Sequence, residues 1–113
     1  MQIDLKRAYC FSKKQALQEI LERDLWPFSQ EINAGKQDDV HWHLWNTHIY
    51  LLSGEFELLY PQNYPNPIRA GDYLFIPARA LHSVKITKPS KRLIGLTMPI
   101  NLDEKNNFAP EEL

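Results

Sequence analysis

The chain has 113 residues, of which 43% are hydrophobic and 24% charged, and its formal net charge at pH 7 is −1. This composition predicts one globular domain over residues 1–113, and it offers no basic excess for binding nucleic acid. Cys10 is the only cysteine, which excludes a disulfide within the chain, and no apolar run approaches the roughly 18 residues of a membrane span. Residues 1–10 also lack the apolar stretch of a secretory signal, so we expect a cytoplasmic protein without a membrane partner.

One amphipathic helix is expected near the N-terminus. Ser12 and Gln15 have the spacing of a capping box, in which a serine oxygen caps the first turn. Apolar residues follow at helical spacing, at Ala16, Leu17, Ile20, Leu21 and Leu25. We therefore predict a helix from about Lys13 to Arg23, inside a helical segment of residues 12–24.

Short apolar runs separated by turn residues make up most of the remaining chain, a pattern typical of an all-β sandwich or small barrel. A barrel over about residues 28–100 would contain strands at Phe28–Asn33, Val40–Trp45, Thr47–Leu52, Glu55–Tyr60, Tyr73–Ile76, His82–Ile86 and Leu93–Met98. Ser53 and Gly54 are expected to form a tight turn, and residues 61–67, which include three prolines, a loop. Residues 101–113 are predicted to be a loosely held acidic tail.

The four histidines are unevenly placed along the chain. His41, His43 and His48 lie close together, and His82 follows much later. Since side chains alternate along a strand, His41 and His43 would share one face and could bind one metal ion together. An H-x-H pair is weak evidence alone, and a third histidine at a defined distance strengthens it.

Two segments around these histidines have regular spacings. The first runs Gly35-x5-His41-x-His43-x3-Thr47-x6-Gly54, and the second runs Gly71-x5-Pro77-x-Arg79-x2-His82. These spacings resemble the two motifs of the cupin family, G-x5-H-x-H-x3,4-E-x6-G and G-x5-P-x-G-x2-H-x3-N. The resemblance implies a jelly-roll β-barrel or sandwich with one short N-terminal helix. It also implies a metal site inside the barrel with His41, His43 and His82 as ligands.

Three positions depart from the cupin pattern. Thr47 stands where the family has glutamate, Arg79 where it has glycine and Ile86 where it has asparagine. Three neutral imidazoles without a carboxylate leave a divalent ion with its full charge and with open coordination positions. In this respect the chain is similar to the thiol dioxygenases, which bind a ferrous ion. The composition of the site suits Zn, Mn or Ni as well as Fe.

Two classes of function follow from this resemblance. One is a metal-dependent, dioxygenase-like enzyme that acts on a small anionic or thiol ligand, and the other is a non-catalytic module that binds or senses a small molecule. Thr47, Ile49 and Leu51 are expected to line the cavity in which that ligand lies. Arg79 is either a clamp for a carboxylate near the metal or a solvated loop arginine.

His48 directly follows the glutamate position of the motif and competes for the role of fourth ligand. On a regular strand, however, it points away from the face shared by His41, His43 and Thr47. A β-bulge would be needed to reverse this, so we expect an outward-facing histidine on a dimer or solvent face. A homodimer is expected as well, because the strand edges would otherwise be exposed.

Overall fold

The computed structural model describes residues 2–62, 64–101 and 103–113. Asn63 of the expected loop and Leu102 of the expected tail lie outside the described residues. The described chain forms six strands, one α-helix and one short 3-10 helix: β1 (Asp4–Lys6), α1 (Lys13–Glu22), β2 (Trp26–Ile32), β3 (Thr47–Tyr60), β4 (Ile68–Arg69), β5 (Tyr73–Ile76), β6 (Ser83–Leu96) and η1 (Pro110–Glu112). An all-β fold with one short N-terminal α-helix is thereby confirmed.

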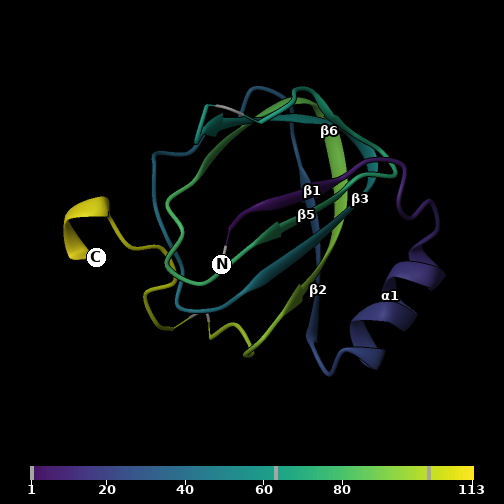
Figure 1. Cartoon of the computed structure of the whole chain (residues 1–113), viewed down its shortest axis with the longest axis horizontal. Coiled ribbons are helices and arrows are strands. Elements are labelled where there is room, and N and C mark those ends of the chain that lie inside the picture. Colours follow the sequence, from purple (N-terminus) through teal and green to yellow (C-terminus); the bar gives the residue numbers. More distant parts are fainter. Residues whose placement is uncertain (1, 63, 102) are drawn as a thin grey trace.

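All strand pairs are antiparallel, in the order β1-β5-β3-β6-β2, with β4 paired to β3. Figure 1 shows these strands curling around a central space, with α1 outside one side of the barrel and the C-terminus at the opposite side. The interior is filled mainly by one cluster of buried side chains: Ile3, Trp45, Ile49, Leu51, Phe56, Leu58, Ile68, Leu74, Ile76, Val84, Ile86, Ile94 and Leu96. None of the described helices is long and apolar enough to cross a membrane.

The helix begins as its sequence predicts, because Ser12 Oγ accepts a hydrogen bond of 3.0 Å from the Gln15 backbone N–H. Ala16 and Ile20 are fully buried between the helix and the sheet, where they pack in a second cluster with Cys10, Leu25, Tyr50, Tyr73 and Leu93. Leu17 and Leu21 are exposed, since only one narrow face of α1 meets the barrel.

The predicted turn at Ser53 and Gly54 is wrong, because β3 continues through these residues. The strand bends there through several bulges, and β6 bends beside it. Gly54 has a φ of +88°, and a Cβ at this position would lie 2.2 Å from the Pro89 carbonyl oxygen. Glycine therefore marks a close approach of two bent strands rather than a hairpin, so four of the predicted strands merge into β3 and β6.

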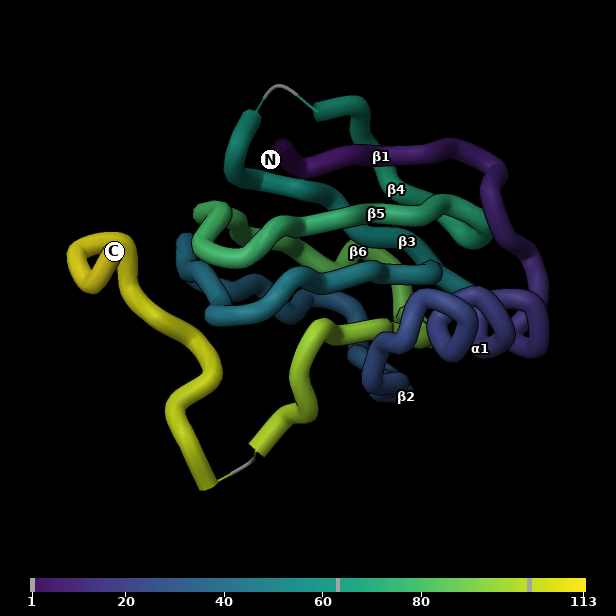
Figure 2. Tube along the Cα trace, turned by 60° about the horizontal axis from the view of Figure 1, so that its bottom comes forward, coloured from purple at the N-terminus to yellow at the C-terminus, as the bar shows by residue number. Residues whose placement is uncertain are grey.

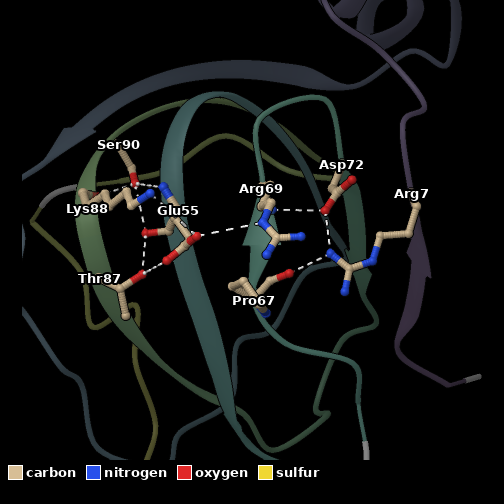
Figure 3. Close-up of polar contacts among 8 residues, drawn as sticks. All are labelled: Arg7, Glu55, Pro67, Arg69, Asp72, Thr87, Lys88 and Ser90. Atoms are coloured by element: carbon tan, nitrogen blue, oxygen red, sulfur yellow. Dashed lines mark hydrogen bonds and ion pairs between the residues drawn. The ribbon is translucent and has the colours of Figure 1, made fainter.

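Polar contacts hold this bend in place (Figure 3). Glu55 on β3 accepts a hydrogen bond of 2.9 Å from Thr87 Oγ1 and lies within ion-pair distance of Lys88 and Arg69. Nearby, Asp72 accepts hydrogen bonds from Arg7 and from the backbone N–H of Arg69, which ties the N-terminal strand to the turn before β5. These contacts link the strands that form the barrel wall.

The predicted strand Val40–Trp45 is also wrong. Among the described residues, His41 pairs only with His82, and Trp42 only with Phe108, each as an isolated bridge. The chain then bends at residues 44–45. A histidine that is bridged singly can tilt inward without the constraint of a regular ladder. The segment is therefore an irregular connection, and the side chains of His41, His43 and Trp45 line the cavity.

The C-terminal segment is held against the barrel, in contrast to the expected loose tail. The Phe108 ring stacks on Trp42 with 4.6 Å between ring centroids, and Trp42 Nε1 donates a hydrogen bond of 2.9 Å to the Ala109 carbonyl. Figure 2 shows this segment leaving the end of β6 and running along the side of the barrel opposite α1. Its net acidic sequence does not reveal this contact, which depends on two aromatic rings.

Candidate metal centre

His41, His43 and His82 come together inside the barrel and are here called the histidine triad. One ring nitrogen of each lies within 4.8 Å of a ring nitrogen of the other two. The backbone explains this juxtaposition, because His41 and His82 exchange two hydrogen bonds of 3.0 and 2.9 Å across their bridge. Their ring centroids are 4.3 Å apart, and that of His43 lies 4.9 Å from His41 and 5.0 Å from His82.

Each ring of the triad is oriented by a backbone carbonyl. The Nδ1 atoms of His41, His43 and His82 lie 2.6, 2.9 and 2.9 Å from the carbonyl oxygens of Asp39, Asn106 and Ala80, respectively. A carbonyl oxygen can only accept, so each Nδ1 carries the proton and each Nε2 carries the free lone pair. This is the arrangement that orients metal-bound histidines in proteins, and it makes the triad fit a divalent ion through three Nε2 atoms.

Burial favours the neutral, metal-binding form of His43 and His82. Desolvation lowers the pKa of His82 to about 3, against a weaker opposing effect of its hydrogen bond to the Ala80 carbonyl. Desolvation also lowers the pKa of His43, whose ring stacks on Trp45 with 5.2 Å between centroids. Both imidazoles are therefore neutral at pH 7, as metal coordination requires.

The triad opens into a cavity of about 210 Å³. Most of its wall is apolar, and both Thr47 and Ile49 line it. Thr47 Oγ1 is buried there and makes no hydrogen bond to any residue that the structure describes. A buried hydroxyl without a protein partner is costly, so this oxygen is suited to pair with a polar group in the cavity.

The other two predicted cavity residues lie elsewhere. Leu51 is 1% exposed and packs in the barrel core, and Arg79 is exposed on the loop before His82; neither is part of the cavity wall. Arg79 nevertheless contributes through its backbone, because its N–H donates a hydrogen bond of 2.8 Å to the His43 carbonyl. Its φ of +67° explains why glycine suits this position in the cupin motif.

His48 lies on the outer side of the sheet, away from the triad. Its Nδ1 is 2.7 Å from the hydroxyl oxygen of Tyr73, and its ring packs on Phe75. Desolvation lowers its pKa to about 4, helped by the nearby Arg23 and opposed by Glu19. The alternation of side chains along β3 therefore separates His48 from the histidine triad, as its sequence position predicts. The expected dimer or solvent face is wrong, however, because His48 is only 9% exposed and packs against Tyr73 and Phe75 within the monomer.

Several cavity residues do not stand out in the sequence. Arg92, Gln30 and Asp38 all line the cavity, and Asn106 supplies the carbonyl that orients His43. A signal for Arg92 does exist, since it has the same strand parity as the interior residues Ile94 and Leu96. No local pattern identifies Asn106, because its role depends on the path of the C-terminal segment.

Comparison with known proteins agrees with this architecture. The model of the Cupin domain family (Cupin_2) matches residues 28–95, which is more than half of the chain. The chain belongs to the cupin family. This assignment confirms the expected fold, and a search of curated proteins found no match to this cupin.

Solved structures share the fold at low sequence identity. The DMSP lyase DddQ from Ruegeria pomeroyi has a TM-score of 0.56 and 22% identity over 70% of this cupin and 40% of the lyase. A DUF861 family protein from Thermotoga maritima has a TM-score of 0.57 and 15% identity over 84% of this cupin and 99% of that protein. RmlC from Streptococcus suis, solved with dTDP-D-xylose, has a TM-score of 0.56 and 14% identity, covering 82% of this cupin and 57% of RmlC. The chain thus spans less than half of the lyase, and these likenesses show the fold alone.

Proposed function

We propose that this cupin holds one divalent metal ion on the Nε2 atoms of the histidine triad and binds a small ligand in the adjoining cavity. The observation that carries the proposal is the convergence of three histidine rings, with one ring nitrogen of each within 4.8 Å of the others. The Nδ1 hydrogen bonds to carbonyls leave the Nε2 lone pair of each ring free. Fe, Zn, Mn and Ni are the candidate ions, since imidazole ligands suit all of these to differing degrees. When bound, such an ion supplies Lewis-acid activation of an oxygen or sulfur donor on the ligand.

The chain's own residues would position that ligand and exclude water from it. The cavity wall is mainly apolar, and Thr47 Oγ1 offers a hydrogen bond that no described protein group uses. A cavity of about 210 Å³ is smaller than the roughly 300–1,000 Å³ of pockets for drug-sized molecules. The proposed ligand is therefore a small molecule, of the size of the anionic or thiol compounds that the cupin resemblance implies.

The metal-binding part is tested by elemental analysis of protein purified without a chelating resin. Wild-type protein should carry about one ion per chain, and His82→Ala should lose it, because two imidazoles hold a divalent ion far less tightly than three. His48→Gln is the matched control, since it removes a buried histidine from the outer face and should keep the ion. Metal-free wild-type protein that also fails to bind added Zn²⁺, Fe²⁺, Mn²⁺ or Ni²⁺ would refute the proposal.

A non-catalytic role is the second candidate, and one observation favours it. Asp38 is the one carboxylate among the described residues of the cavity wall, and its Oδ1 already accepts a hydrogen bond of 2.7 Å from the Val84 N–H. Asp38 is thereby partly committed to the barrel backbone, and the described cavity wall offers no second carboxylate to act as a general base. Dioxygen uptake by the iron-loaded protein with a panel of small thiols and carboxylates separates the two roles: uptake supports an oxygenase, and ligand binding without turnover supports a sensor.

A further inference from the structure

Arg92 is a buried arginine in the barrel interior without an acidic partner. It lies on β6 and is only 9% exposed, and no carboxylate of the described residues lies within ion-pair distance of it. Its Nε and Nη2 both donate to Gln30 Oε1, the side chain directly across the sheet, and its guanidinium lies 5.7 Å from the centre of the Phe56 ring. Nη1 makes no hydrogen bond to the described part of the protein.

The electrostatic cost of this arrangement is substantial. Desolvation lowers the pKa of Arg92 to about 10, with Asp38 opposing the shift, so the guanidinium stays charged at neutral pH. A buried charge that lacks an ion partner destabilises a fold, and an apolar side chain of similar size would fill this position at less cost. The guanidinium therefore has a use beyond packing.

Arg92 also lies where an anion can reach it. A second cavity of about 390 Å³ adjoins the first, and the two share Gln30, Asp38, Val84, Arg92 and Asn107 in their walls. The first cavity, whose wall includes both Arg92 and the triad, is mainly apolar, with Ile49, Val84 and Ile94 among its residues. Arg92 and Asp38 are the two charged residues described in the first cavity, and a divalent ion on the triad would make this space strongly positive.

We propose that Arg92, held by Gln30 and stacked on Phe56, binds the carboxylate of a small ligand whose other end reaches the histidine triad. The guanidinium presents donors in a planar fork that matches a carboxylate, and the apolar wall accommodates a short hydrocarbon body. The ligand class is thus a small carboxylate with an apolar chain and a second donor group. This inference rests on the proposed function only for the second donor; the carboxylate site itself needs no metal.

The test compares pentanoate with pentanamide, a neutral molecule of nearly the same shape, by calorimetric titration of zinc-loaded and chelator-treated protein. Wild-type protein should bind pentanoate about tenfold or more tighter than pentanamide, because a hydrogen bond to a charged group is lost with the amide. Arg92→Met should abolish this preference. Arg79→Met removes an exposed arginine outside the cavity and should preserve it.

Metal content measured on the same samples separates this inference from the proposed function. If the protein cannot bind metal but still prefers pentanoate in a way that depends on Arg92, the anion site is supported and the metal centre is refuted. Equal affinity for the two probes, or a preference that survives Arg92→Met, would overturn the anion site even if the ion is bound. Because Arg92→Met could alter folding, the wild-type Nε–Hε NMR signal of Arg92 provides an independent readout: it should shift with pentanoate and not with pentanamide, and an unchanged signal would overturn the proposal.

Discussion

The two faces of β3 look onto histidines in different chemical settings. Thr47 faces the cavity and the histidine triad, whereas the next residue, His48, faces the outer side beneath α1. Burial lowers the pKa of histidines on both faces, to about 3 for His82 and about 4 for His48. Burial alone therefore does not distinguish a metal ligand from a structural histidine.

The hydrogen-bond partners distinguish the two settings. Each Nδ1 of the triad meets a carbonyl, which only accepts, so Nε2 is left free in three neighbouring rings. His48 Nδ1 contacts the Tyr73 hydroxyl, which can donate or accept a hydrogen bond. Among the described residues, His48 is not part of the cluster of His41, His43 and His82. A set of metal-binding histidines thus requires fixed tautomers and free ring nitrogens that point to one place. A lone buried histidine has no neighbouring rings with which to share a metal ion.

The largest expected difference between the two faces is in stability linked to metal. Zinc at about 100 times its Kd should stabilise the wild-type protein by about 2.7 kcal/mol, which corresponds to a rise in Tm of roughly 10 °C for a chain of this length. The rise should disappear in His41→Ala and persist in His48→Gln. Thermal unfolding with and without zinc measures it, and an equal rise in both variants would place the metal elsewhere.

Acid sensitivity should depend on the outer face. As pH falls below 6.5, the unfolded chain protonates His48, whereas the folded protein keeps it neutral until its pKa of about 4. The folded state loses on the order of 2–3 kcal/mol of relative stability between these pH values, and His48→Gln removes that loss.

Urea unfolding of chelator-treated protein at pH 7 and pH 4.5 measures this contribution. The triad is the same in both proteins, so its own titration cancels in the comparison. Wild-type and His48→Gln proteins that lose stability in parallel would contradict the assigned environment of His48.

The C-terminal segment should matter for the triad and not for the outer face. Deleting residues 106–113 removes the carbonyl that orients His43 and the Phe108 ring that stacks on Trp42. Zinc affinity should fall by roughly 10- to 100-fold, as for other losses of a group that orients a ligand. Deleting only residues 110–113 keeps both contacts, and an equal loss in the two truncations would show that the orienting carbonyl is unimportant.

The smallest expected effect concerns the loop before His82. Arg79→Gly should stabilise the protein by about 1 kcal/mol or less, because glycine adopts positive φ without strain but has more freedom when unfolded. Urea unfolding checks the sign, and zinc affinity should not change. Destabilisation would mean that the Arg79 side chain makes a contribution that outweighs the backbone strain.

Sequence reasoning was most successful where a property is local. Capping at Ser12, the spacing of the triad and the outward face of His48 all follow from periodicity or motif spacing, and the structure agrees with them. The turn at Gly54 was wrong because glycine serves a close approach between bent strands as well as a turn, and sequence does not separate these uses.

Long-range features could not be predicted in the same way. Arg79 is near His82 in sequence but is exposed on its loop, which agrees with the solvated alternative. Arg92 lies in the cavity through the pairing of β6 with β2. The stacking of Phe108 on Trp42 also joins residues that are far apart in the chain. Both features depend on how the barrel closes, and their local sequence carries little information about it.

The most direct test of the metal centre observes all four histidines in one experiment. In the ¹H–¹⁵N long-range correlation spectrum of protein with ¹⁵N-labelled histidine, each ring reports its tautomer and its metal contact. We expect Nδ1–H tautomers for His41, His43 and His82. Their Nε2 signals should shift when zinc is added, and those of His48 should stay unchanged. Unshifted Nε2 signals in the triad, or a zinc-dependent shift of His48 in their place, would contradict this expectation.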